Sequence, residues 1–379
     1  MKSDNAVKVK TAIGQLLRKE RPPIREVASV VGLMVSCFPG VKHAPLFYRA
    51  FENDKTYALK QTGWSHDEHM QISDLAKKDL SWWLENVDHD PCPIMPTEPR
   101  VTLKCDSSLE GWGSVIDNSS TTANGRWSPQ ESYDINYLEI KAVLFGLKYL
   151  CSKFKHCSIK VLSDNQTAVA YLRNMDGTHS RDCNQITREN TLWCKDRDIS
   201  LTITHLPGKL NVEADKASRE LHDDTEWSLD VNVYQTLVSR WGTPDVDLFA
   251  TRLNAKILCY VAWKPDPNAF AIDAFTLNWS VFNLVYCFPP FSVIGKVLQK
   301  LIQYQTTAIL VLPDWPTQFW YPRVTSMLLA PPMRINLQKT TLTLPHNASK
   351  VHALYPNLQL IGCLVSGKHS DLKVYLAKP

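Results

Sequence analysis

The sequence lacks several features that would place it in a common functional class. Its 379 residues include ten cysteines but no Cys-x-x-Cys pair, and the densest cysteine cluster, Cys151 to Cys157 with His156, fits no common zinc spacing. We therefore expect reduced thiols and a cytoplasmic or nuclear location. No apolar run approaches the roughly 20 residues of a membrane-spanning helix, so no membrane association is expected. No signal peptide is expected at the first residues either.

The chain as a whole also lacks a strong excess of one charge. It carries 42 basic and 38 acidic residues, and a net charge of +4 is too small to establish a nucleic-acid partner. Acidic residues outnumber basic ones between residues 101 and 225, and these acids lie near the ends of expected strands. A local acid excess in a nearly neutral chain indicates cation binding. Segment 226–379 is more basic, and there we expect a phosphate-facing surface.

Two linker-like segments divide the chain into three expected domains. A length of 379 residues exceeds one ordinary core, and 44% apolar content is that of a globular protein. The first linker is rich in proline and the second is polar. We therefore predict a helical region with its linker over 1–99, an α/β domain over 100–222, and a smaller α/β domain over 223–379. Within the first, helices are expected near 1–20, 22–38 and 69–87.

The middle segment alternates strand patterns with helix patterns. A turn at Glu110-Gly111 separates the first two strands, and a third strand near Gly125-Trp127 is left open. The remaining apolar runs follow in the order helix, strand, helix, helix, strand, helix, and the first of these helices is expected over 137–150. This order predicts a mixed sheet with helices packed on it.

Four acids of this segment lie beside strand ends. Asp106 is late in the first strand, Glu139 is in the first turn of the first long helix, Asp164 follows the third apolar strand, and Asp215 is early in the last helix. A sheet of this order would bring all four to one edge. Carboxylates so close repel one another strongly unless a cation joins them, and Mg²⁺ prefers such hard oxygen ligands. A pair of these ions would activate a water and stabilise the leaving oxygen of a phosphodiester.

Each acid also has a simpler alternative role. Asp106 would serve as an Asx turn residue, and Glu139 as a surface acid near a helix N-terminus. Asp164 would serve as a helix N-cap and Asp215 as a solvated helix acid. The position of one acid does not decide between these roles and metal binding.

Four runs carry the acids in a fixed order: "CDSSLEGWGSVI", "LEIKAVLFGLKYL", "VLSDNQTAVAYL" and "HLPGKLNVEADKASR". Together they resemble the ribonuclease H domain of retroelement reverse transcriptases, with the best match to DIRS-type retrotransposons. The resemblance covers residues 100–222. It implies a ribonuclease H-like fold in which Asp106, Glu139, Asp164 and Asp215 are catalytic residues that bind two Mg²⁺ or Mn²⁺ ions.

The resemblance also implies a substrate and further site residues. Such domains cut the RNA strand of an RNA–DNA hybrid, leave a 3′-hydroxyl and a 5′-phosphate, and read groove shape and the 2′-hydroxyl rather than base sequence. His205 would assist catalysis by proton transfer or product release, since histidine side chains ordinarily titrate near neutral pH. Ser107, Asn165 and Gln166 would contact the nucleic acid.

The flanking segments resemble other parts of the same elements. The runs "IREVASVVGLMVSCFPGVKHAPLFYRAFE" and "SDLAKKDLSWWLENV" of the N-terminal region resemble the thumb and connection. On this resemblance the polymerase palm, a potential partner, would lie upstream. The only Asp-Asp pair, Asp223-Asp224, lacks the apolar hairpin of a polymerase Y-x-D-D motif, so it is interpreted as a solvated linker and DNA synthesis by this chain alone is not expected.

The runs "PDVDLFATRLNAK", "YCFPPFSVIGKVL" and "AILVLPDWPTQFWYP" of the C-terminal region resemble the segment after ribonuclease H in DIRS-type elements. That segment is similar to DNA adenine methyltransferases, but the key motif is altered here. Phe288 stands where active enzymes have Asn or Asp, so a target amine would lose its polar partner, and no glycine-rich cofactor loop is present. Candidate cofactor contacts are Asp247, Pro289, Pro290 and Phe291. Asp245 and Asp247 could contact a cofactor ribose, and the alternative for both is a structural role. Two other functions therefore stay open: a catalytically inactive nucleic-acid-binding remnant and an adenine methyltransferase. The oligomeric state is not indicated.

Overall fold

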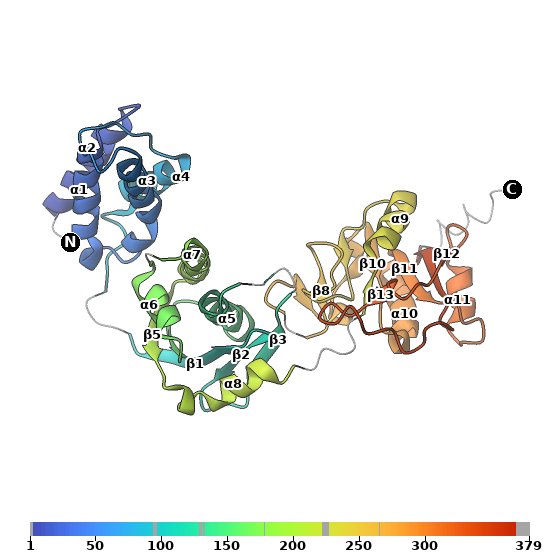
Figure 1. Ribbon diagram of the computed structural model, residues 1–379. Helices are drawn as coiled ribbons and strands as arrows, with labels where there is room; N and C mark the ends of the chain where they lie inside the picture. Colours follow the sequence, from blue (N-terminus) through green and yellow to red (C-terminus); the bar gives the residue numbers. More distant parts are fainter. Residues whose placement is uncertain are drawn as a thin grey trace. The chain divides into compact units, whose positions relative to one another are not determined.

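The computed structural model describes residues 3–93, 97–128, 131, 133–177, 179–221, 227–264 and 266–368. The chain forms two compact units (Figure 1). The first comprises Met1–Ala123 with Tyr133–Arg219, and the second Asn124–Ser132 with Glu220–Pro379. The expected boundaries at residues 99 and 222 stay predictions, and the Asp223-Asp224 pair lies outside the described residues.

The first unit begins with a helical region. Its elements are α1 (Ser3–Leu17), α2 (Ile24–Ser36), η1 (Phe38–Gly40), η2 (Ala44–Phe47), α3 (Arg49–Gln61) and α4 (Asp74–Asn86). Helix α2 begins directly after Pro23, whose fixed φ suits a helix start. Helix α4 begins after Ser73, whose side chain accepts a hydrogen bond from the Ala76 N–H. Buried apolar residues from all four helices, among them Ile13, Met34, Phe51 and Trp83, form one core.

A five-stranded mixed sheet follows, with strand order β3-β2-β1-β4-β5. The strands are β1 (Pro99–Ser107), β2 (Gly111–Ile116), β3 (Thr122–Arg126), β4 (Cys157–Ser163) and β5 (Ile199–His205). Strands β1 and β2 form an antiparallel hairpin, whereas β1 with β4 and β4 with β5 are parallel pairs. The third strand near Gly125 is therefore confirmed, and so is the mixed sheet.

Helices cover both faces of this sheet (Figure 1). They are α5 (Ile135–Leu150), α6 (Gln166–Asn174), α7 (Arg181–Lys195) and α8 (Val212–Arg219), and η3 (Gly208–Leu210) precedes the last of them. Successive residues of β2 point to opposite faces. The hydroxyl of Ser114 reaches the Ala142 carbonyl of α5, whereas Gly113 lies against the backbone of α8. Helices α5 and α8 therefore lie on opposite sides of the hairpin.

The second unit contains its own five-stranded sheet, of order β12-β14-β11-β10-β7. Val285 and Cys287 of β10 pack into the core that contains α10, and Tyr286 between them packs into the core that contains α9. Helices thus cover both faces here as well, which confirms the predicted α/β class. Its elements are β6 (Ser228–Leu229), α9 (Val231–Trp241), β7 (Val246–Asp247), β8 (Val261–Ala262), β9 (Ala271–Ile272), η4 (Ala274–Thr276), η5 (Trp279–Val281), β10 (Leu284–Cys287), η6 (Phe291–Val293), α10 (Ile294–Tyr304), β11 (Thr307–Pro313), α11 (Tyr321–Ser326), β12 (Met333–Ile335), β13 (Leu342–Thr343) and β14 (Leu360–Ser366).

Every helix within the described ranges is too short or too polar to span a bilayer.

Candidate metal centre

Three of the four predicted acids meet at one edge of the first sheet. Asp106 lies near the end of β1, and Asp164 directly follows the parallel neighbour β4. The register pairs Lys104 with Leu162, so both acids stand two residues beyond the same pair. Glu139 reaches the same edge from α5. One carboxylate oxygen from each of the three residues lies within 4.8 Å of the others.

Burial makes the ionised form of Asp106 costly. The residue is 5% exposed, and burial is the largest of the effects that raise its pKa to about 6. The Ser218 hydroxyl donates a hydrogen bond of 2.7 Å to Asp106 Oδ2 and opposes the shift, while the negative charges of Asp164 and Asp215 add to it. The Ser218 hydroxyl therefore holds this carboxylate in place, but the neighbouring acids add negative charge to its surroundings.

Glu139 is the most perturbed acid of the group. It begins the second turn of α5 rather than the first, because the helix starts at Ile135 and not at Tyr137. Burial, followed by the charges of Asp106 and Asp164, raises its pKa to about 9. The Ser107 N–H donates to Oε1 at 3.3 Å, but Oε2 is buried and has no hydrogen-bond partner among the described residues. A buried acceptor without a donor, surrounded by other carboxylates, fits a divalent cation.

Asp164 does not cap the helix that follows it. The N-cap of α6 is Asn165, whose Oδ1 accepts from the Ala168 N–H at 2.8 Å, so the capping alternative for Asp164 is wrong. Asn165 is the residue directly before α6 and therefore caps the helix, whereas the Asp164 side chain lies in the carboxylate cluster. A Cβ atom on Gly208 would lie only 2.8 Å from Asp164 Oδ2, so glycine lets this backbone approach the carboxylate.

His205 lies next to Asp164. It ends β5, its ring is exposed, and Nε2 is 3.1 Å from the backbone oxygen of Asp164. The register of β4 and β5, which pairs Ser163 with His205, accounts for this placement. The structure therefore brings the predicted histidine to the edge that holds the acids.

Asp215 stands apart from the other three acids. It lies in α8, and its Oδ1 pairs with the Arg219 guanidinium at 2.7 Å. The Ser218 hydroxyl links the two parts of the site, because it contacts both the Asp215 carbonyl and the Asp106 carboxylate. Asp215 is therefore near enough to raise the pKa of Asp106, but its own carboxylate is paired with the Arg219 guanidinium.

The three predicted nucleic-acid contacts differ in their availability. Ser107 is 8% exposed and its hydroxyl donates to the Ser108 carbonyl. Asn165 uses Oδ1 in the helix cap and donates from Nδ2 to Asn136 at 3.1 Å. Gln166 is exposed and lines a cavity. All three roles stay predictions, and Gln166 is the one whose side chain has no hydrogen-bond partner among the described residues.

Two supporting residues have no role in the sequence-based prediction. Asn211 is fully buried at the start of α8, and its Nδ2 donates to the Cys105 carbonyl at 3.0 Å. Ser218 is equally buried. Both residues belong to the His205–Arg219 run, but a polar residue in a short helix is usually solvated, so the sequence does not single them out. The packing shows that both are buried and hold α8 beside Asp106 through their hydrogen bonds.

The predicted cofactor contacts of the second unit have a different setting. Asp247 is 2% exposed, burial raises its pKa to about 6, and its carboxylate accepts from the backbone N–H groups of Phe249 and Lys256. Asp245 likewise accepts from the N–H groups of Asn283 and Leu284. The alternative that these acids hold loops in place therefore has hydrogen bonds to support it, and the cofactor role stays a prediction.

The altered motif lines a cavity of about 620 Å³ within the second unit. Its walls are largely aromatic and include Trp227, Phe249, Trp263, Phe275, Phe288, Pro289, Pro290, Phe291 and His352. Phe288 is part of this wall, and its phenyl ring offers no hydrogen bond. The methyltransferase alternative, with Pro289, Pro290 and Phe291 in the wall of this cavity, stays a prediction.

No protein-family profile and no curated protein matches the chain. Among solved structures, the chain is similar to LC11-RNase H1 in complex with an RNA/DNA hybrid, with 16% identity, 32% of this chain and 96% of that chain covered, and a TM-score of 0.29. It is also similar to RNase H1 from the archaeon Halobacterium salinarum NRC-1, with 19% identity, 33% and 98% coverage, and a TM-score of 0.28. The foamy viral protease-reverse transcriptase in complex with an RNA/DNA hybrid matches 54% of this chain and 27% of its own, with 11% identity and a TM-score of 0.22. Similarities at this level carry no information on activity, which must come from the carboxylates themselves.

Proposed function

We propose that this protein is a metal-dependent endonuclease that cleaves the RNA strand of RNA–DNA hybrids. The observation that carries the proposal is the carboxylate cluster of Asp106, Glu139 and Asp164, with one oxygen from each within 4.8 Å of the others. Two of these acids are buried and have a raised pKa, so the cluster is unfavourable without a cation. The order of the four sequence runs supports the choice of substrate and an origin in a DIRS-type retrotransposon.

The proposed metal ligands are Asp106, Glu139 and Asp164, with Asp215 as a fourth acid from α8. Hard carboxylate oxygens favour Mg²⁺ or Mn²⁺ over softer metals. When bound, a pair of such ions supplies an activated water and neutralises charge on the leaving oxygen of a phosphodiester. The proposed products carry a 3′-hydroxyl and a 5′-phosphate.

The chain's own residues organise this edge. Ser107 orients Glu139 through its backbone N–H, and Ser218 orients Asp106 through its hydroxyl. His205 is exposed beside Asp164, where Nε2 donates to the Asp164 carbonyl and Nδ1 is left to accept or deliver a proton or to assist product release. Binding of a double helix across this edge would exclude water from the cluster.

The purified protein is expected to cut the labelled RNA strand of a hybrid in Mg²⁺ or Mn²⁺ and to be inactive in EDTA. Double-stranded DNA of the same sequence should stay intact, since the 2′-hydroxyl is part of recognition. Denaturing gels of the end-labelled strand would measure both. A wild-type protein that leaves the hybrid intact with either metal would contradict the proposal, and hybrid binding without cleavage would favour the inactive remnant.

Ser218→Ala is expected to weaken metal binding about tenfold, the lower end of the range for partners that orient a ligand. The change removes the hydrogen bond to Asp106 Oδ2, so the pKa of Asp106 should rise further. Calorimetric titration with Mn²⁺ measures the affinity. Ser81→Ala is the matched control, because Ser81 also bonds a carbonyl of its own helix but lies exposed in α4. Equal affinities for both variants would show that Ser218 does not position the acid.

A further inference from the structure

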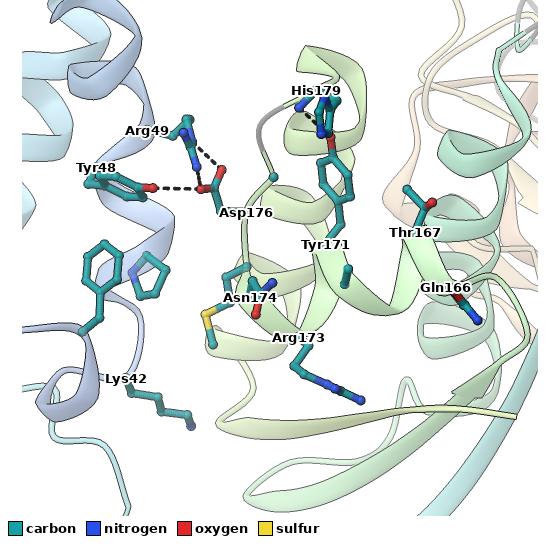
Figure 2. Close-up of a pocket in the computed structure, with 15 residues that line it drawn as sticks. Lys42, Tyr48, Arg49, Gln166, Thr167, Tyr171, Arg173, Asn174, Asp176 and His179 are labelled. Atoms are coloured by element: carbon teal, nitrogen blue, oxygen red, sulfur yellow. Dashed lines mark hydrogen bonds and ion pairs between the residues drawn. The ribbon is translucent and has the colours of Figure 1, made fainter. Parts of the chain in front are cut away.

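A cleft of about 780 Å³ lies within the first unit, between α6 and the segment that holds η1 and η2 (Figure 2). One wall belongs to the ribonuclease H-like sheet region and the other to the helical region. None of the acids of the candidate metal centre lines the cleft, and its first lining residue on α6, Gln166, follows Asp164 by two positions.

The α6 wall is a single exposed helix face. Gln166, Ala170, Arg173 and Asn174 recur at helical spacing, are exposed, and line the cleft. The nine residues of α6 span about 13 Å at 1.5 Å per residue, and the helix leads away from the metal centre. Each strand of a duplex carries one phosphate per roughly 3.4 Å of the helix axis, so the wall spans about four phosphates when measured along that axis.

Ion pairs join the two walls. Arg49 of the helical region pairs with Asp176, which follows α6, and the Tyr48 hydroxyl donates to the same carboxylate at 3.1 Å (Figure 2). A second tie is formed by Arg188 of α7, which donates to the Leu46 carbonyl at 2.7 Å and to the buried carboxylate of Asp79 at 3.0 Å. These contacts therefore hold the two walls of the cleft together.

The remaining charge of the cleft is positive. Asp176 is its only acidic lining residue among the described positions, and Arg49 neutralises it. Neither Lys42 nor Arg173 forms an ion pair with an acid in the part of the chain that the structure describes. Lys42 Nζ donates to the Ser200 hydroxyl at 3.0 Å, and Arg173 donates one N–H to the Ile203 carbonyl, which leaves further donors on both side chains. Their hydrogen bonds are to neutral groups, so both keep their charge for an anionic ligand.

We propose that this cleft binds the phosphate backbone of the hybrid several nucleotides from the metal centre, with Lys42 and Arg173 as the contacts. The inference rests on the proposed function, which supplies the nucleic acid. It gives the helical region a role in substrate binding, because Lys42 comes from that region and Arg173 from the sheet region. The two basic groups extend the binding surface away from the acidic edge, where an uncompensated carboxylate cluster repels phosphates.

The test is hybrid affinity in a cleavage-deficient background. Asp164→Asn protein in Mg²⁺ is titrated, by fluorescence anisotropy, into a long hybrid that crosses the cleft and into a short hybrid hairpin whose stem ends before it. Adding Lys42→Ala and Arg173→Ala is expected to weaken binding of the long hybrid about tenfold and to lower the salt slope by about 0.9 per lost contact. Binding of the short hairpin should not change.

Two control variants test whether a loss of hybrid binding is specific to the cleft or follows from the loss of any positive charge. Lys153→Ala with Lys155→Ala removes two exposed lysines between α5 and β4 that do not line the cleft, and it should leave both affinities unchanged. Lys42→Arg with Arg173→Lys keeps the charge and should bind the long hybrid like the parent. An equal loss in this charge-keeping variant would overturn the proposal.

The failure of this inference can be told apart from failure of the proposed function. If the double alanine variant binds the long hybrid as the parent does, the cleft is not a phosphate site, while wild-type cleavage of the hybrid still stands. If the wild-type protein neither binds nor cuts any hybrid, the proposed function itself fails and the cleft proposal fails with it.

Discussion

Glu139→Gln is expected to reduce hybrid cleavage strongly while making the metal-free protein more stable. The glutamine keeps an oxygen to accept the Ser107 N–H, so the local geometry should survive. Cleavage should fall roughly a thousandfold, because losing a ligand costs more than the 10–100-fold typical of outer partners. Single-turnover cleavage of labelled hybrid in Mg²⁺ measures this loss.

The stability gain follows from proton linkage. The folded protein raises the pKa of Glu139 from its ordinary 4.5 to about 9, chiefly by burial, so the folded state keeps a proton that the unfolded state releases. The free energy of unfolding of the metal-free protein therefore falls as pH rises between those values, by at most about 1.4 kcal/mol per pH unit. Asp106 adds a smaller effect of the same sign between its ordinary 3.8 and about 6.

Urea unfolding in EDTA at several pH values measures this dependence. Glu139→Gln should flatten the decline of the free energy of unfolding above pH 6 and raise this free energy by on the order of 2 kcal/mol at pH 8. The gain is smaller than proton linkage alone would allow, because the new amide also lacks a hydrogen-bond partner. Glu85→Gln, at an exposed position of α4, is the matched control and should change neither cleavage nor slope. A wild-type protein whose metal-free stability rises from pH 6 to pH 8 would contradict the cluster's electrostatics.

The sequence predicted those parts of the site that depend on strand ends. Asp106 and Asp164 each finish an apolar strand, and parallel neighbours end at the same edge of a sheet, so their meeting follows from pattern alone. Helix α3 was not predicted, because it buries only Phe51 and Leu59 and its apolar stripe is too narrow to stand out.

The parts that depend on packing could not be predicted. The sequence predicts Asp215 as a fourth metal ligand, which stays a prediction, and it does not reveal the ion pair that Asp215 Oδ1 forms with Arg219 four residues on. The cap on α6 falls on Asn165 rather than Asp164, although both residue types are good caps. Burial of Asn211 and Ser218 depends on how closely α8 approaches the sheet.

That close approach leads to the second large effect, which is expected for Gly113→Ala. A Cβ atom at this position of β2 would lie 2.4 Å from the Ser218 nitrogen and 2.5 Å from the Ala214 oxygen, both backbone atoms of α8. Backbone of a packed helix cannot rotate away, so the whole helix must shift. We expect a loss of about 3 kcal/mol in the free energy of unfolding, the upper part of the range for overpacking.

The displaced helix should also disturb the metal centre. Ser218 and Asp215 both lie on α8, so a shift that relieves the clash lengthens the hydrogen bond from Ser218 to Asp106. Mn²⁺ affinity should therefore fall together with stability, and calorimetric titration at a temperature where the variant is still folded separates the two losses. A destabilised variant with unchanged affinity would mean that α8 is dispensable for metal binding.

Gly32→Ala is the matched control for the same chemical change. Gly32 lies in α2, where an added Cβ meets no atom within 4 Å. Alanine there should stabilise the protein by up to about 1 kcal/mol, because glycine is the poorer helix former. The two substitutions add one methyl group each and are expected to act in opposite directions, since only Gly113 has a helix backbone in the space that the methyl would occupy. Equal effects at the two sites would mean that α8 does not lie against β2 as closely as described.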